Sequence, residues 1–376
     1  MDTRTILPLC DARPAQHDRS MPLTTTALAD LRDAFTPVTG YLDAATLGLP
    51  PRASADALRD ALDAWQSGRA DAAGYDAAVR RSRAAYARLV GVPVEHVAVG
   101  SQASSLVGVV AAGLPDGAEV VVVDGDFTSV VFPFLAHADR GVRVRHVPLD
   151  RLADQVRPGT DLVAFSLVQS RDGRVADADA VCTAAAAAGA RTLCDTTQAA
   201  GWFPVDAARF DVTVCSAYKW LCGPRGAAFL TVRPEVAATL RPLHAGWYAG
   251  ADVWSSVYGP DMTLAPDARR FDVSPAWLCW VGLAPALELL AGVDPHEVRA
   301  HDAGLADALR ARLGVEPTGS AVVALPDATG ALRARLAEHG VRAAGRGGGV
   351  RLAFHVWCTD ADVERAADAI VGARAA

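Results

Sequence analysis

The feature that most limits the fold of this chain is a regular alternation of short apolar runs with helix-like segments. Runs such as "VVVV" within residues 118–125 and "LVAF" within residues 161–167 carry polar residues only at their ends. Strands of this kind are buried on both faces, as in a parallel sheet covered by helices. The alternation therefore predicts an α/β fold with a mostly parallel, doubly wound sheet. The alternating segments are residues 95–100, 105–114, 118–125, 142–149, 161–167, 177–190, 191–197 and 211–217.

The pattern changes towards the carboxyl end, which predicts a second domain. Residues 46–285 are expected to form the large α/β domain. Residues 286–376 combine helical periodicity with the strand-like runs "AVVAL" and "GVRLAF", so we assign them, together with residues 27–45, to a small α+β domain. Residues 1–26 are polar and are expected to be loose. The length of 376 residues suits about two domains.

Composition excludes several classes of protein. A formal net charge of -7 argues against a nucleic-acid partner, which needs a basic face. No apolar run approaches the roughly 18 residues of a membrane span, and the amino terminus does not resemble a signal peptide. The 7 cysteines include no C-x-x-C pair, which favours reduced thiols in a cytoplasm over disulfides or a metal site.

Several polar or aromatic residues follow the predicted strands, at the sheet edge where ligands bind in such folds. The first strand runs into Ser101, Gln102 and Ala103 at a helix start, where backbone amides could hold a phosphate or simply form an ordinary helix cap. Phe127 follows the second strand and could stack on a flat ring or merely pack. Asp195 ends a later strand and could pair with a protonated ring nitrogen or act as a cap.

The last of these strands leads to Lys219, the one lysine among 36 basic residues. Arginine stays protonated, whereas a desolvated lysine amine can lose its proton and attack a carbonyl. Drift in an arginine-rich composition explains why other lysines are absent. It does not explain why the remaining one follows a buried strand, three residues after Ser216.

A phosphate cradle, a stacking aromatic ring, an acid for a pyridinium and a Schiff-base lysine are together the requirements of pyridoxal 5'-phosphate (PLP). At this point the sequence resembles class V of the PLP-dependent aminotransferase fold (fold type I), which includes cysteine desulfurases, kynureninases, isopenicillin N epimerases and carbon–sulfur lyases. The resemblance spans about residues 41–370. Its matching segments are "GSQAS", "DFTS", "CDTTQAAG", "SAYKWLCGPRG", "RRFDVSPAW" and "VRLAFHVWCTDADVERA".

The resemblance implies a role for each matched residue. Lys219 is implied as the catalytic residue that binds PLP covalently and moves the substrate α-proton, and Asp195 as the partner of the ring nitrogen. Arg351 is implied to bind the substrate α-carboxylate, although a surface arginine at a strand start would look the same. A homodimer is also implied, with Ser274 reaching the neighbouring subunit's phosphate. The remaining cofactor contacts implied are Ser101, Gln102, Ala103, Phe127, Gln198, Ser216 and Tyr218.

Departures from the family pattern narrow the expected reaction. Cysteine desulfurases carry a nucleophilic cysteine shortly before the arginine strand, but residues 342–349 read "RAAGRGGG". The segments "SAYKWLCGPRG" and "RRFDVSPAWLCWVG" look most like the carbon–sulfur lyase subgroup. This resemblance, with no such cysteine present, implies a carbon–sulfur β-lyase that acts on a cysteine S-conjugate, a small amino-acid substrate. A decarboxylating oxidative deaminase, an epimerase and an aminotransferase remain open, as does an inactive PLP-binding protein. A nicotinamide enzyme is disfavoured because no G-x-G-x-x-G follows the first strand.

Overall fold

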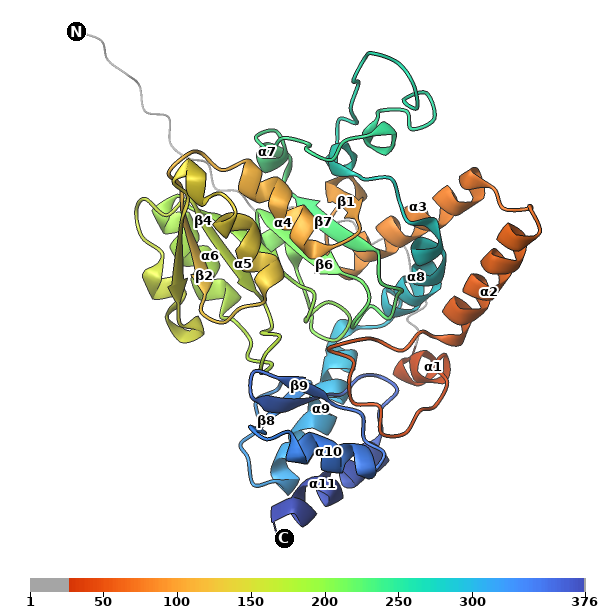
Figure 1. The fold of residues 1–376 in the computed structure, drawn as a ribbon, viewed down its shortest axis with the longest axis vertical. Helices are drawn as coiled ribbons and strands as arrows, with labels where there is room; N and C mark the ends of the chain where they lie inside the picture. The colour runs from red at the N-terminus through yellow and green to blue at the C-terminus, as the bar shows by residue number, and fades with distance from the viewer. Residues whose placement is uncertain (1–26, 375–376) are drawn as a thin grey trace.

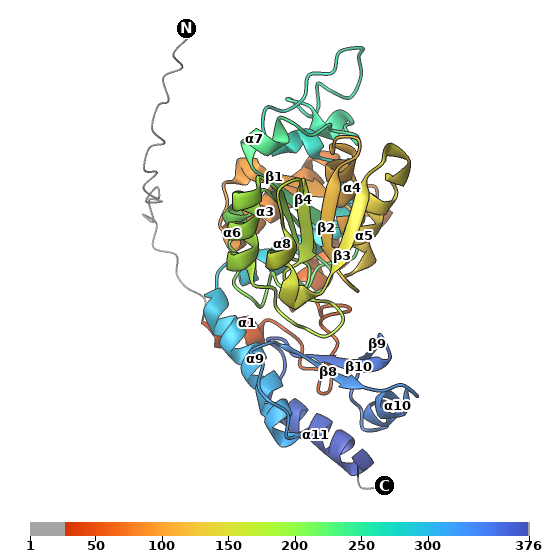
Figure 2. The same cartoon turned by 90° about the vertical axis from the view of Figure 1, so that its left-hand side faces the viewer.

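The computed structural model describes residues 27–374, so the segment expected to be loose, residues 1–26, lies outside it. The described chain contains a seven-stranded sheet and a three-stranded sheet. Figure 1 shows the large sheet with its helices above the small sheet, and Figure 2 shows the same arrangement from the side. The expected α/β class with a mostly parallel sheet is confirmed.

The large sheet has the strand order β1-β7-β6-β5-β4-β2-β3. The pairs β2/β3, β2/β4, β4/β5 and β5/β6 are parallel, and β7 runs antiparallel to both of its neighbours. The carboxyl ends of the six other strands therefore meet at one edge of the sheet. The strands are β1 (Val97–Gly100), β2 (Glu119–Val123), β3 (Arg143–Val147), β4 (Leu162–Ser166), β5 (Arg191–Asp195), β6 (Val212–Ser216) and β7 (Ala228–Val232).

Helices cover both faces of this sheet, which explains the uninterrupted apolar runs. In β2, Val120 and Val122 belong to the core beneath one pair of helices, whereas Val121 and Val123 belong to the core on the opposite face. The first face is covered by α4 (Ala103–Ala112) and α5 (Thr128–Leu135). The second is covered by α3 (Ala72–Leu89), α6 (Ala178–Ala188) and α8 (Trp277–Leu290).

Strand β7 is the one member of the large sheet to which the sequence analysis assigned no element. It follows the lysine-bearing loop and returns antiparallel beside β6, with Ser216 opposite Ala228. A short connection can join only antiparallel neighbours, since a parallel pair needs a long crossover. The loop over residues 217–227 is thus held between the ends of two adjacent strands.

The small sheet is antiparallel and consists of β8 (Val322–Pro326), β10 (Gly349–Ala353) and β9 (Ala344–Arg346). Residues 40–43 run beside it, with bridges from Tyr41 to Arg342 and from Asp43 to Ala353. The domain boundary predicted at residue 286 falls inside α8, and the division into domains stays a prediction. The helices of this part are α1 (Leu28–Asp33), α9 (Pro295–Arg312), α10 (Ala331–Glu338) and α11 (Asp360–Arg374).

The remaining elements lie at the periphery. The helix α2 (Arg52–Gln66) packs beside α8, and the short α7 (Pro234–Ala237) follows β7. In residues 27–374, no one helix has both the length and the apolarity to cross a membrane; α8 and α9 meet that test only as a pair bent by 93°. Single 3-10 turns occur at residues 94–96, 138–140, 149–151, 153–155, 207–209, 247–249 and 268–271.

Candidate active site

A cavity of about 270 Å³ lies at the carboxyl edge of the large sheet and is closed on one side by the small sheet. It receives residues that follow β1, β2, β4 and β6, together with Arg346 from β9. This is the position where ligands bind in open α/β sheets, because the strand order leaves a crevice there. The lining includes seven of the residues predicted from sequence: Ser101, Gln102, Ala103, Phe127, Ser216, Tyr218 and Lys219.

Lys219 lies in the loop after β6 and is only 5% exposed. Backbone hydrogen bonds from Ala217 to Ala227 and from Gly223 to Ala217, both 3.0 Å long, close this loop. Burial lowers the pKa of Lys219 to about 8, because the charged amine is desolvated; Asp195 opposes the shift and Arg351 adds to it. Far more of the amine is therefore unprotonated near neutral pH than for an ordinary lysine.

Asp195 is the last residue of β5 and is almost fully buried. Burial raises the pKa of its carboxyl group above the usual range, whereas hydrogen bonds from Thr197 and the charge of Lys219 lower it. The backbone amide of Thr197 donates to Asp195 at 2.8 Å, and the Thr197 hydroxyl accepts from the Ser216 amide at 2.9 Å. Thr197 thus connects the end of β5 to the end of β6.

The part of the cavity lining that follows β1 and β2 is rich in hydrogen-bond donors. Helix α4 begins there, and its cap residue Gln102 makes no side-chain hydrogen bond to the helix amides. Amides at a helix start and nearby hydroxyls form a favourable site for a phosphate. The ring of Phe127 lies at the start of α5, with its centroid 5.0 Å from the Lys219 amine. The lining hydroxyl residues at the starts of α4 and α5 are Ser101, Ser104, Thr128 and Ser129, and Ser216 adds a hydroxyl at the end of β6.

Gln198 is buried beside the cavity but does not line it. Its amide nitrogen donates to the Ala45 carbonyl at 3.0 Å and to the Ser170 hydroxyl at 3.1 Å. Its amide oxygen accepts from the indole of Trp220 at 2.7 Å. Gln198 therefore connects three segments around the cavity. The contact with the PLP ring that the resemblance implies for Gln198 stays a prediction.

Arg351 also lies behind the lining, on β10, and is 1% exposed. Its guanidinium donates to the Thr46 hydroxyl at 2.9 Å and to the Ser170 backbone and side chain, while its Nε has no hydrogen-bond partner. Among the described residues no carboxylate lies within ion-pair distance of it. Burial and the charge of Arg346 together lower the pKa of Arg351 to about 10, although the charge of Asp43 opposes the shift. A buried guanidinium that lacks a carboxylate partner is suited to bind an anion.

Ser274 lies outside the cavity and is exposed. Its neighbour Asp272 is buried and paired with Arg83 at 2.6 Å, which anchors this segment against β1. The contact predicted for Ser274 involves a second subunit, so that contact and the homodimer stay predictions.

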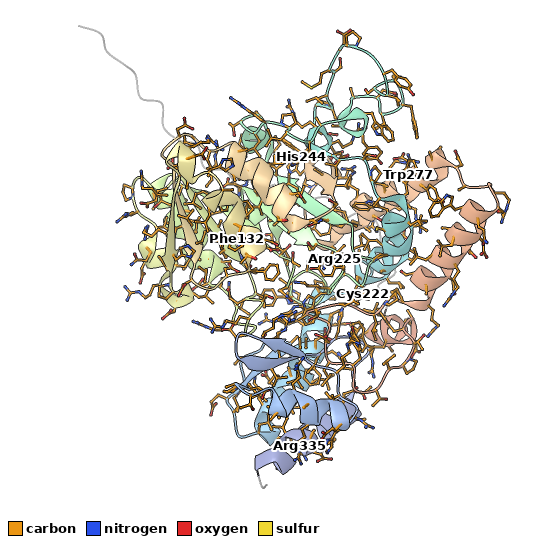
Figure 3. All side chains as sticks on the ribbon, viewed as in Figure 1. Phe132, Cys222, Arg225, His244, Trp277 and Arg335 are labelled. Atoms are coloured by element: carbon orange, nitrogen blue, oxygen red, sulfur yellow. The ribbon has the colours of Figure 1, made fainter. Side chains whose placement is uncertain are left out.

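Eight other residues line the cavity and were not predicted as site residues: Ala45, Thr46, Ser104, Thr128, Ser129, Ser170, Arg225 and Arg346. Ser104 is the last residue of the matched "GSQAS" segment, so the helix start was a usable signal. Thr46 and Arg346 lie 300 positions apart. The glycine-rich "GRGGG" around Arg346 indicates a flexible turn near the entrance of the site, but it assigns no role to Arg346 itself. Figure 3 labels Arg225 between the large sheet and the small sheet, close to Cys222.

The residues present fit PLP: a desolvated lysine faces an aromatic ring, a buried carboxylate lies at the adjacent strand end, and a donor-rich helix start could hold the phosphate. The fold is that of the fold type I PLP-dependent enzymes. More narrowly, the chain belongs to the class V aminotransferase family, whose family model, "Aminotransferase class-V", matches residues 41–329. Membership of this family and PLP as its cofactor, both expected from sequence, are confirmed.

Similar proteins come from several branches of the family. The chain is 30% identical over 312 residues to an uncharacterized aminotransferase, YcbU, of Bacillus subtilis, covering 77% of this chain and 82% of the relative. It is 32% identical to the kynureninase of Deinococcus radiodurans, with 71% and 69% covered. The cysteine desulfurase CsdA of Escherichia coli has a similar fold, with a TM-score of 0.80 at 22% identity, covering 93% of this chain and 99% of CsdA.

Proposed function

We propose that this PLP-dependent enzyme is a carbon–sulfur β-lyase that converts a cysteine S-conjugate and water into a thiol, pyruvate and ammonia. The observation that carries the proposal is that the cavity holds an amine able to remove an α-proton but no thiol able to accept sulfur. None of the cysteines in residues 27–374 belongs to its lining. Persulfide formation needs such a thiolate, whereas elimination needs only a base and a leaving group.

Several residues would bind and orient the cofactor and the substrate. The amides at the start of α4, with the hydroxyl of Ser216, would hold the phosphate. Asp195 would accept a hydrogen bond from the ring nitrogen, and Phe127 would lie against the ring. Arg351 would bind the α-carboxylate, because its guanidinium is buried and lacks a carboxylate partner in the described chain.

The bound cofactor supplies an electron sink for the charge left on the substrate α-carbon. Lys219 accepts the α-proton at Nζ, since its lowered pKa makes the amine available as a base near neutral pH. The same amine can later return a proton as an acid. Binding of the α-carboxylate by Arg351 would fix which bond at the α-carbon faces Lys219.

The proposal is tested with a panel of cysteine S-conjugates, cysteine, kynurenine and alanine. We expect equimolar thiol and pyruvate from the conjugates, and neither product from Lys219→Ala. Aldehyde with carbon dioxide would instead indicate decarboxylating oxidative deamination, and racemised amino acid alone would indicate an epimerase. A protein that binds PLP but converts no member of the panel would contradict an enzymatic role.

A further inference from the structure

Where the small sheet meets the cavity, two guanidinium groups donate hydrogen bonds to the same hydroxyl group. Arg351 donates to Thr46 Oγ1 at 2.9 Å, and Arg346 donates to the same oxygen at 3.2 Å. Arg351 is buried, whereas Arg346 is exposed at the end of β9 and lines the cavity. Arg346 therefore occupies the solvent side of this pair.

The pair is only partly compensated by the protein: the charge of Asp43 raises the pKa of Arg351, but Asp43 is paired with Arg342 at 3.7 Å. No Asp or Glu belongs to the cavity lining, and within residues 27–374 neither arginine forms an ion pair. The two positive charges repel each other, so Arg346 lowers the pKa of Arg351, and both arginines lower the pKa of Lys219. By contrast, the buried Arg83 is paired with Asp272 at 2.6 Å. Bound anions would relieve the repulsion between Arg346 and Arg351.

Two anions are already assigned to other donors by the proposed function. The cofactor phosphate belongs to the start of α4, and the α-carboxylate belongs to Arg351. Arg346 is left without an anion, although its guanidinium shares an acceptor with that of Arg351. An anion on Arg346 must therefore belong to a part of the substrate beyond the α-carbon, on the side of the cavity that opens to solvent.

We propose that the sulfur-borne substituent of the substrate carries an anionic group, in its simplest form a carboxylate, and that Arg346 binds this group. The proposal rests on the lyase function given above, and it adds the chemical class of the substituent. A planar guanidinium can take a carboxylate in two parallel hydrogen bonds, which an amide of the same shape cannot reproduce.

The test compares two substrates that differ in charge but hardly in shape, S-carboxymethyl-L-cysteine and S-carbamoylmethyl-L-cysteine. We expect the holoenzyme to prefer the acid in kcat/KM by about tenfold or more, the scale of one charge-assisted hydrogen bond. Arg346→Gln should bring the ratio close to one, because the acid loses a contact that the amide does not make. An unchanged ratio in Arg346→Gln would overturn the proposal.

Arg333→Gln is the matched control. Arg333 lies on α10 and its side chain reaches to within 3.6 Å of the Cβ position at Gly345, but it is outside the cavity lining. The substitution removes the same charge near the same sheet, so the ratio should stay at the wild-type value. An equal loss in both variants would mean that the general positive field, and not a contact with Arg346, selects the acid.

A second pair of ligands separates this proposal from the lyase function. L-2-aminoadipate has the shape of S-carboxymethyl-cysteine without the sulfur leaving group, and its δ-amide is the neutral counterpart. Calorimetry on the holoenzyme should give tighter binding of the acid, and Arg346→Gln should abolish the difference. Preference for the acid without any thiol release would support the anion site and refute the lyase. Thiol release together with equal binding of the two ligands would support the lyase and refute the anion site.

Discussion

At the scale of single residues, the chemistry depends on the protonation of the Lys219 amine. Its pKa of about 8 lies below the ordinary 10.5 because burial disfavours the charged form. Covalent attachment of PLP requires the unprotonated amine. We therefore expect the rate at which apoprotein gains the visible absorbance of bound PLP to rise with pH and to reach half its maximum near pH 8. Stopped-flow absorbance over a pH series measures this midpoint.

Two variants test the cause of this shift. Asp195→Asn should move the midpoint to lower pH, since the Asp195 charge raises the lysine pKa against the effect of burial. Lys219→Arg keeps the positive charge but cannot attach the cofactor, so it should show no such absorbance. A midpoint near the ordinary value of lysine would contradict the assignment of a desolvated amine.

How far the site follows from sequence differs between these residues. Lys219 could be predicted, because a chain with one lysine leaves a single candidate for Schiff-base chemistry. Asp195 and Ser216 could be predicted, because each directly ends an apolar run. Arg346 and Thr46 could not: they are 300 positions apart, they meet through tertiary packing alone, and arginine is common throughout the chain.

At the scale of elements, the lysine-bearing loop is positioned by a close approach of the chain at Gly48. The Gly48 amide donates to the Tyr218 carbonyl at 3.0 Å, and a Cβ at this position would lie 2.0 Å from the Lys219 carbonyl oxygen. Gly48→Ala should therefore displace the loop and lower the free energy of unfolding by about 1–3 kcal/mol. Urea denaturation of the holoenzyme measures the loss.

A glycine in open space gives the opposite expectation. Gly304 lies within α9 with no atom within 4 Å of its Cβ position. Gly304→Ala should therefore stabilise the protein, by about 0.4–1 kcal/mol, because alanine restricts the unfolded chain and suits a helix. Equal effects of the two substitutions would refute the steric explanation for Gly48.

The elements themselves were largely readable from the sequence, with one informative exception. Apolar runs bounded by polar residues predicted the buried parallel strands, because burial on both faces removes alternation. Strand β7 was missed. Its residues "AFLTV" resemble the other runs, but its direction depends on the closed loop around Lys219, which tertiary contacts define.

At the scale of the whole molecule, a buried polar cluster joins the small sheet to the lysine-bearing loop. His355 follows β10, and its Nδ1 lies 2.9 Å from Asp302 on α9. Its Nε2 lies 3.0 Å from the Trp220 carbonyl and 3.5 Å from Cys222 Sγ. A carboxylate and a carbonyl both accept hydrogen bonds, so the protonated ring satisfies both. Burial alone would lower the pKa of His355, but Cys222 and Asp302 outweigh it and raise the pKa to about 10.

This raised pKa predicts a specific dependence of stability on pH. Stability from the protonated His355 is fully present below its ordinary pKa of 6.5 and is lost as the pH rises through about 10. Asp302→Asn should cost about 3–5 kcal/mol at pH 7, since it leaves a buried charge without its counterion. The difference in the free energy of unfolding between Asp302→Asn and the wild type should become smaller at pH 10. Urea denaturation at the two pH values measures this difference.

The control is Asp56→Asn, at an exposed ion pair with Arg59, which should cost less than about 1 kcal/mol at both pH values. An Asp302→Asn deficit that is equal at pH 7 and pH 10 would show that the contact does not depend on the His355 charge.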